Sequence, residues 1–345
     1  MVCQLQTGNG VLKEIGMKWM TKSVGALAAL ALVLQSGTAF AADDVAFQLD
    51  WTPGGISAAY YLGVTEGCFT DQDINVTISR GYGAADAVTK VATGVADFSV
   101  TDLGVIIGAI SETQAPVKAI MPIVSMSPLA IAVRDDSPIR TLKDLEGRKL
   151  GSSVGNAALE YVPLGMTLAG ADYTKVEEVL ADGSALNGLL LGGQIDALAS
   201  YITSTVQLNS LAQQSGLSVR PVFYGDQLDI YNASVFTSDA MITSNPDLVS
   251  RFKAAVQCSF EAATANPEAA VDAITAQVEG MLRETQVEAV PFAMNFSFGD
   301  NAIFAANGFT WDLDRVAHNI DIVGQVKGKT LTLTADDVVY APAAE

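Results

Sequence analysis

Trp51 and its neighbours are the residues of this sequence best placed for ligand chemistry. Trp51 follows an expected strand at 45–49 and precedes the turn Pro53-Gly54-Gly55. In open α/β sheets, ligands bind at the carboxyl ends of the strands, so this indole ring can stack on a flat solute. Its polar neighbours Asp50 and Thr52 favour a position in a cleft over one in the core.

Four expected helix starts add polar donors, at Gly83, Thr101-Asp102, Ser153–Asn156 and Gly183-Ser184. The first N–H groups of a helix lack partners and carry positive partial charge, so they bind carboxylates, sulfonates or phosphates without Lys or Arg. The Ser153–Asn156 loop is the strongest of the four, and simple N-capping explains it equally well. It lacks the Gly-Lys-Ser/Thr ending of a P-loop, and Gly81-Tyr82-Gly83 lacks the third glycine of a dinucleotide fingerprint.

Tyrosines and carboxylates supply further candidate contacts, a mixture that suits an aromatic or amine-bearing solute. Glu160 can accept a hydrogen bond from an amine or a ring N–H, although a solvated helical position is the slightly better interpretation. The expected ligand contacts are Trp51, Ser57, Tyr61, Gly83, Asp102, Ser127, Ser153, Asn156, Glu160, Asp182 and Tyr201.

We expect no catalytic residue, metal site or cofactor. Serine-hydrolase chemistry is not expected, because the single histidine, His318, lacks an evident catalytic partner and is interpreted as a surface residue. Cys68 and Cys258 are too few for a zinc or iron–sulfur site. An exported protein can form disulfides, but we interpret these two cysteines as separate buried thiols.

The first 41 residues have the order of a secretory signal peptide. Lys18 and Lys22 precede an apolar run at 24–34, which is followed by an A-x-A cleavage site at 39–41. We expect cleavage after Ala41 and a periplasmic mature protein, with Met17 as an alternative start. The net charge of −19 becomes −21 without this leader, which carries three Lys and one Glu. So acidic a chain disfavours nucleic acid and anionic lipid as partners.

Short apolar runs alternate with helical stretches, which predicts an α/β fold with mainly parallel strands. Removal of the leader would leave 304 residues of the 345, a length that favours two lobes. The expected strands are 45–49, 74–79, 97–100, 117–124, 129–133, 149–151, 197–201 and 233–237. The expected helices are 57–66, 84–93, 141–145, one ending near 168, 184–192, 245–264, 267–277, 282–290 and 312–322.

Several blocks of the sequence resemble the periplasmic solute-binding proteins of ABC importers that serve nitrate, sulfonates, taurine and thiamine-pyrimidine precursors. The blocks cover most of the mature chain and together are specific for the family, although none fixes the solute. They are Leu49–Pro53, Tyr61, Glu66-Gly67, Phe69, Gly81, Gly83, Gly94 with Ala96–Phe98, Pro116–Ile120, Ala130–Val133, Ser137–Ile139, Leu142–Gly147 and Gly192–Ala197.

The resemblance implies a type II binding-protein fold with two α/β lobes and a ligand cleft between them. Lobe one would comprise 42–133 and 235–345, and lobe two 134–234. The strands at 129–133 and 233–237 would cross between them. Relatives that resemble pyrimidine binders often carry a histidine where this chain has Ser57, a departure that argues against a pyrimidine ligand.

The leading interpretation is a monomeric protein that captures a small solute by closing its two lobes and delivers it to an ABC permease. The solute would be aromatic or heterocyclic, with or without a negative charge, or a compact anion such as a sulfonate or nitrate. One alternative is an enzyme resembling the synthase of the thiamine pyrimidine, which needs an active-site histidine and a cysteine-rich iron site. Another is a solute sensor that partners a membrane receptor.

Overall fold

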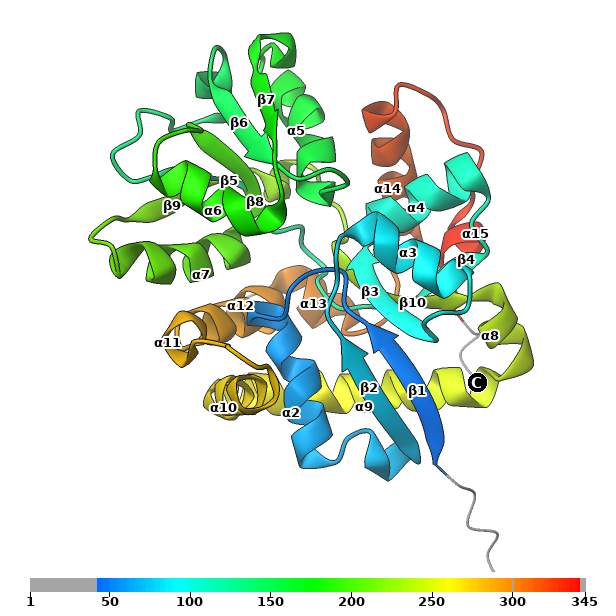
Figure 1. Ribbon diagram of the computed structural model, residues 1–345. Coiled ribbons are helices and arrows are strands. Elements are labelled where there is room, and N and C mark those ends of the chain that lie inside the picture. Colours follow the sequence, from blue (N-terminus) through cyan, green and yellow to red (C-terminus); the bar gives the residue numbers. More distant parts are fainter. Residues whose placement is uncertain (1–41, 300, 342–345) are drawn as a thin grey trace, which may run out of the picture. The chain divides into compact units, whose positions relative to one another are not determined.

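The computed structural model describes residues 42–299 and 301–341, which form two five-stranded sheets with helices packed on both faces of each (Figure 1). The expected signal peptide at 1–41 lies outside the described residues. Within them, no helix is both long and apolar enough to cross a membrane.

The first sheet has the order β2-β1-β3-β10-β4. Its strands are β1 (Asp43–Gln48), β2 (Ile74–Ser79), β3 (Phe98–Asp102), β4 (Val117–Pro122) and β10 (Ala233–Ser238). β1 pairs in parallel with β2 and β3, whereas β10 is antiparallel to both β3 and β4. Four of the five strands therefore run the same way, which confirms the α/β expectation, although the sheet is mixed.

The second sheet repeats this plan in the order β7-β6-β8-β5-β9. Its strands are β5 (Leu129–Arg134), β6 (Lys149–Ser152), β7 (Glu177–Leu180), β8 (Ala197–Tyr201) and β9 (Val219–Phe223). β5 is the reversed strand, antiparallel to β8 and β9. It is a continuous apolar run because both of its faces are covered by helices.

Two apolar cores cover the two faces of the first sheet. One core contains α2 (Ala58–Glu66), α9 (Pro246–Ala265), α10 (Pro267–Gln277) and α12 (Ala289–Phe298). The other contains α3 (Ala84–Ala92), α4 (Leu103–Thr113), α14 (Leu313–Val326) and α15 (Ala335–Val338).

The second sheet is covered by α5 (Ala157–Leu168) on one face and by α6 (Gly183–Leu191) and α7 (Ile202–Gln213) on the other. The remaining elements are short. They are α8 (Asp239–Ser244), α11 (Arg283–Gln286), α13 (Ala302–Asn307), η2 (Gly55–Ser57), η3 (Thr70–Gln72), η4 (Leu142–Leu145), η5 (Tyr173–Lys175) and η6 (Gly225–Gln227).

The chain passes between the sheets twice, through 123–128 and 224–232. These segments are tied together, since the Asn232 N–H donates to the Val124 carbonyl at 2.9 Å. The expected crossing strand 129–133 was assigned to lobe one, but as β5 it pairs only within the second sheet. The strand expected at 233–237 likewise belongs wholly to the first sheet, as β10.

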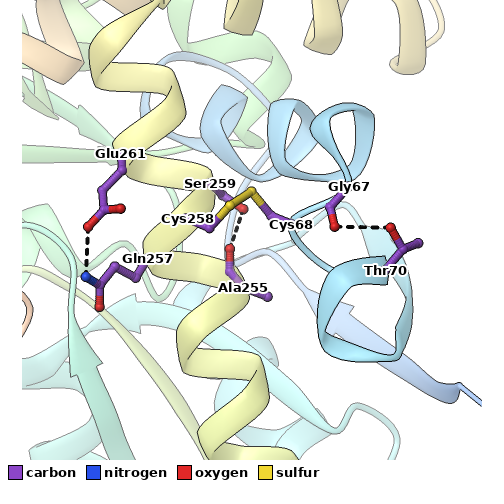
Figure 2. The surroundings of a disulfide bond; sticks show 8 residues. All are labelled: Gly67, Cys68, Thr70, Ala255, Gln257, Cys258, Ser259 and Glu261. Atoms are coloured by element: carbon purple, nitrogen blue, oxygen red, sulfur yellow. Dashed lines mark hydrogen bonds between the residues drawn. A yellow bond between two sulfur atoms is a disulfide. The ribbon is translucent and has the colours of Figure 1, made fainter.

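Cys68 and Cys258 form a disulfide, so the expectation of two separate thiols was wrong (Figure 2). Cys68 directly follows the glycine that ends α2, and Cys258 lies within α9. The two helices approach closely because Gly63 has no side chain. A Cβ there would lie 1.8 Å from the Ser259 Oγ. This approach leaves the cysteine Cα atoms 5.7 Å apart, a usual distance for a disulfide.

His318 is half-buried, which corrects its interpretation as a surface residue. It lies on α14, and its ring Nε2 is 3.0 Å from the carbonyl oxygen of Leu228, in the second crossing segment. The same helix contacts this segment through Asn319, whose side-chain oxygen accepts from the Tyr231 N–H at 2.9 Å. The amphipathic pattern identified the helix but not the chain segment that covers its polar side.

Candidate ligand-binding cleft

The ends of strands from both sheets open into one cleft of about 890 Å³. The first sheet contributes what we call the first wall, which includes Asp50, Trp51, Tyr60 and Asp102. The second sheet contributes the second wall, which includes Ser153, Asn156, Asp182, Gly183 and Tyr201. The volume lies in the range of sites that enclose an organic molecule.

Eight of the eleven expected contacts line this cleft: Trp51, Ser57, Gly83, Asp102, Ser153, Asn156, Asp182 and Tyr201. The other three do not. Tyr61 packs in the core of the first sheet, Ser127 is buried in the first crossing segment, and Glu160 is exposed on α5, 4.0 Å from the Lys327 ammonium.

Tyr60 lines the cleft in place of Tyr61. Consecutive helical residues point in directions about 100° apart, so only one of two adjacent tyrosines can face the site. The Tyr60 side chain is 2% exposed and its hydroxyl has no hydrogen-bond partner among the described residues. The hydroxyls of Ser153 and Ser297, which also line the cleft, share this property. Buried polar atoms of this kind are ready to bind a polar ligand.

Trp51 reaches across the cleft. It is 43% exposed, and a Cβ built on Gly183 of the second wall would lie 2.7 Å from its Cζ2 atom. The indole edge therefore rests on the first residue of α6, and a side chain at position 183 would displace it. The two walls thus meet at the ring that the sequence identified as a stacking platform.

Asp102 joins the walls at a second point. Its Oδ2 accepts a hydrogen bond of 2.6 Å from the Tyr201 hydroxyl, and its Oδ1 accepts one from the Asn232 side-chain amide. Burial raises the pKa of Asp102 to about 7, and the nearby charges of Asp50 and Glu160 act in the same direction, against the hydrogen bond from Tyr201. Sequence reasoning missed Asn232, because nothing local marks a contact 130 residues away.

Asp50 is a second carboxyl of the first wall. Burial raises its pKa to about 6. The charge of Asp50 in turn raises the pKa of Tyr60, whose own burial has the larger effect. These two side chains therefore lie close together. The position of Asp50 directly after a strand was a signal that could have identified it as a contact.

Two of the helix starts at the cleft, those of α5 and α6, are capped by their own polar side chains. Asn156 caps α5 by accepting from the Ala158 N–H at 3.0 Å, and Asp182 caps α6 by accepting from the Ser184 N–H at 2.9 Å. α4 begins after Asp102 itself. Among the described residues, the Asp102 side chain makes no capping bond to α4, and the N-cap of α3 is Gly83, which has no side chain. Asn156 thus caps α5 as the capping interpretation predicts, and ligand contact at the Ser153–Asn156 loop stays a prediction.

Across residues 42–299 and 301–341, no three His, Cys, Asp or Glu side chains are grouped as metal ligands. The cleft holds donors and acceptors for an organic solute. Its described lining contains no histidine and no cysteine.

Comparison with known proteins identifies a family whose model matches this chain. The family model described as NMT1/THI5 like matches residues 56–270. A riboflavin-binding protein of Chloroflexus aurantiacus is 24% identical over 283 residues, which cover 77% of this chain and 78% of that protein. A 4-amino-5-hydroxymethyl-2-methylpyrimidine phosphate synthase of Aspergillus parasiticus is 22% identical over 250 residues, covering 67% and 69%.

The fold is that of periplasmic binding proteins. The alkanesulfonate-binding protein of Xanthomonas axonopodis pv. citri, solved with MOPS bound, superposes with a TM-score of 0.67 at 14% identity. The match covers 86% of this chain and 98% of that one.

Proposed function

The chain belongs to the NMT1/THI5-like family, and from this premise we propose that it is the periplasmic solute-binding component of an ABC importer. Its solute would be a flat aromatic or heterocyclic molecule held in the cleft between the two sheets. The observation that carries the proposal is the cleft itself, lined from both walls, with the Trp51 ring resting on Gly183 of the opposite wall.

The size and lining of the cleft favour an aromatic solute over a compact anion. About 890 Å³ is far more space than a nitrate or a taurine would fill, and the buried hydroxyls of Tyr60, Ser153 and Ser297 suit a solute with several polar atoms. The similarity to a riboflavin-binding protein supports a solute of this kind. Riboflavin is therefore the first compound to test, followed by aminopyrimidines.

Capture would proceed by closure. A solute that contacts both walls stabilises the closed arrangement, and closure then presents a surface to the permease. The proposed lobes are those of the sequence analysis, with the first boundary moved so that β5 joins lobe two. The protein would act as a monomer, after export and cleavage following Ala41.

The enzyme alternative finds less support in the cleft. The only histidine, His318, contacts Leu228 and does not line the cleft, and the two cysteines of the proposed mature chain are joined in a disulfide. The side chains that the synthase chemistry requires are thus not gathered at the site, despite the similarity to a synthase. A sensory role would use the same solute and the same closure, with a different membrane partner.

The proposal is tested by titrating riboflavin into the protein and into Trp51→Ala. We expect riboflavin fluorescence to be quenched on binding, and affinity to fall by about 1–3 kcal/mol in the variant, since a stacking face is lost. Leu313→Ala is the matched control, because Leu313 is 44% exposed, like Trp51, but does not line the cleft. Equal affinity in all three proteins would reject the stacking site.

Native mass spectrometry of the periplasmic protein identifies any solute that co-purifies, and the intact mass reports the cleavage site. Closure is tested with that solute. At a hundredfold excess over Kd it should stabilise the protein by about 2.7 kcal/mol, and small-angle scattering should show compaction. Tight binding with an unchanged radius of gyration would reject closure.

A further inference from the structure

Charged side chains are distributed unevenly along the cleft. Asp102 and Tyr60 are buried and Asp50 is half-buried, and we call these three residues the acidic floor. Arg80 and Asp182 lie at the exposed mouth. Arg80 is the only basic side chain in the described lining, and its guanidinium sits 4.7 Å from the centre of the Tyr82 ring. The basic group therefore stays at the mouth. There the pKa of Asp182 is lowered by hydrogen bonds from Ser184 and, to a smaller extent, by the charge of Arg80.

The acidic floor offers hydrogen-bond acceptors without a positive charge to balance them. Asp102 is 5% exposed, and its two hydrogen bonds come from neutral donors, the Tyr201 hydroxyl and the Asn232 amide. The Tyr60 hydroxyl, 2% exposed, has no partner in the described chain. Two carboxylates that share a buried site without a counter-ion are costly to keep ionised, unless a ligand supplies the missing charge or donor.

The helix starts strengthen this asymmetry. Among the helix starts that line the cleft, those of α4 and α6 have a carboxylate at the N-cap, Asp102 and Asp182, and that of α5 has Asn156. A carboxylate at a helix start occupies the position that an anionic ligand would otherwise take. Side-chain hydrogen bonds cap the starts of α5 and α6. The starts of α3, α4 and α7 have no side-chain capping bond in the described chain, but at α4 the Asp102 carboxylate stands at the N-cap.

We infer that the solute presents a hydrogen-bond-donating nitrogen group to Asp50, Tyr60 and Asp102, and that the cleft prefers a positive charge on this group over a negative one. The inference rests on the proposed function, because it assumes that the flat part of the solute lies in the same cleft. It specifies a chemical class, a nitrogen heterocycle or aromatic amine or amidine, and it rejects the anionic solutes that the helix starts first suggested.

Three probes of the same flat shape test it: benzamidine, benzamide and benzoate, which are cationic, neutral and anionic. Binding is measured by calorimetry or ligand-observed NMR at about pH 8, above the raised pKa values of about 6 for Asp50 and about 7 for Asp102. Each probe offers the same ring to Trp51. We expect benzamidine to bind at least about tenfold more tightly than benzoate, with benzamide between them, because charge-assisted hydrogen bonds are the strong ones.

Two variants localise the effect. Asp50→Asn should remove most of the preference for benzamidine over benzoate, and Tyr60→Phe should weaken benzamide binding several-fold. Tyr60→Phe should leave the melting temperature unchanged, because the hydroxyl makes no hydrogen bond to the described chain. Asp71→Asn is the matched control, an exposed carboxylate outside the cleft, and should change no affinity.

The outcomes separate the two proposals. Benzoate binding as tightly as benzamidine, or an unchanged preference in Asp50→Asn, would overturn the inference and leave the stacking site intact. Failure of all three probes and of riboflavin to bind would overturn the proposed cleft function, and the inference with it.

Discussion

The two walls of the cleft are built on the same plan and carry different side chains. Each is formed by the strand ends of a five-stranded sheet with a single reversed strand. The first wall holds the half-buried Asp50 and the buried Asp102, whereas the second holds the capped starts of α5 and α6 and the small residue Gly183. Under the proposed function, the first wall would recognise the charge of the solute and the second would accommodate the closing movement.

The walls also differ in how they are braced. Tyr60 of the first wall belongs to α2, which the Cys68–Cys258 disulfide ties to α9. The described part of the second sheet's lobe contains no disulfide, and its helices are held by packing and by hydrogen bonds such as that from the Val219 N–H to the Asn209 side chain of α7. The first wall is therefore supported by a disulfide, and the described part of the second is not. This difference is consistent with closure by movement of the second lobe.

The largest expected effect comes from removing this brace. In Cys68→Ser/Cys258→Ser the disulfide that spans 190 residues is lost, and the loop-entropy model gives a destabilisation of roughly 5 kcal/mol. Chemical denaturation of the double variant and of the unreduced wild type measures the difference. Hydrogen exchange should show faster opening of α2 and α9 than of α5 and α6. Equal loosening of both sheets would contradict the difference in bracing.

The buried carboxyls give the next effect. Because burial raises the pKa of Asp102 to about 7, far above its value near 3.9 in an unfolded chain, the folded protein binds more protons between these values. The free energy of unfolding must then fall as pH rises from about 4 to about 7. Asp50, with a pKa of about 6, adds to the fall.

Asp102→Asn removes one of these charges and keeps the shape of the side chain. We expect the unliganded variant to be more stable than wild type by about 2–4 kcal/mol at pH 8 and nearly equal at pH 4. The Tyr201 hydroxyl can accept from the new amide, so the link between the walls is retained. Melting curves across this pH range measure the difference. A variant that is less stable at pH 8 would show that Asp102 serves the structure more than the ligand.

The third effect tests the second wall. Gly183→Ala places a methyl group 2.7 Å from the Trp51 Cζ2 atom, and crowding of this kind costs about 1–3 kcal/mol. The cost should appear in riboflavin affinity, which we expect to fall roughly tenfold by calorimetry. Gly188→Ala, on the same helix with no atom within 4 Å of the added carbon, is the control. A similar loss in both variants would assign the effect to α6 itself.

The difference between central and edge strands explains which strands the sequence could predict. Strands such as β5 were found because burial on both faces leaves a continuous apolar run. The edge strands β7 and β9 were missed because an edge tolerates Glu177, Glu178 and Pro221. α7 was missed because its Ser, Thr and Asn residues have weak helix propensity, and packing of Leu208 and Ala212 compensates for it.

For the cleft, the residues at strand ends and helix starts were predictable from local patterns, as Trp51, Asp102 and Asn156 show. The choice between Tyr60 and Tyr61 depended on the orientation of α2, which packing against α9 and α10 sets. The disulfide and the bond from Asn232 to Asp102 join positions 190 and 130 residues apart. No local pattern encodes such contacts.

The smallest expected effect comes from Asn156→Asp, which adds a carboxylate to the second wall. Asn156→Asp retains an oxygen to accept from the Ala158 N–H, so α5 stays capped. It loses the amide donor to the Ser152 hydroxyl, a bond of 3.0 Å, so stability should change by no more than about 1 kcal/mol. The added charge faces the same cleft as Asp50 and Asp102. Benzamidine should therefore bind about twofold to fivefold more tightly and benzoate more weakly, by a similar factor, because a half-exposed charge is well screened. Raising the salt concentration should reduce both changes. Tighter binding of benzoate would mean that the start of α5 receives an anion after all, and the contrast between the walls would then lie in their bracing alone.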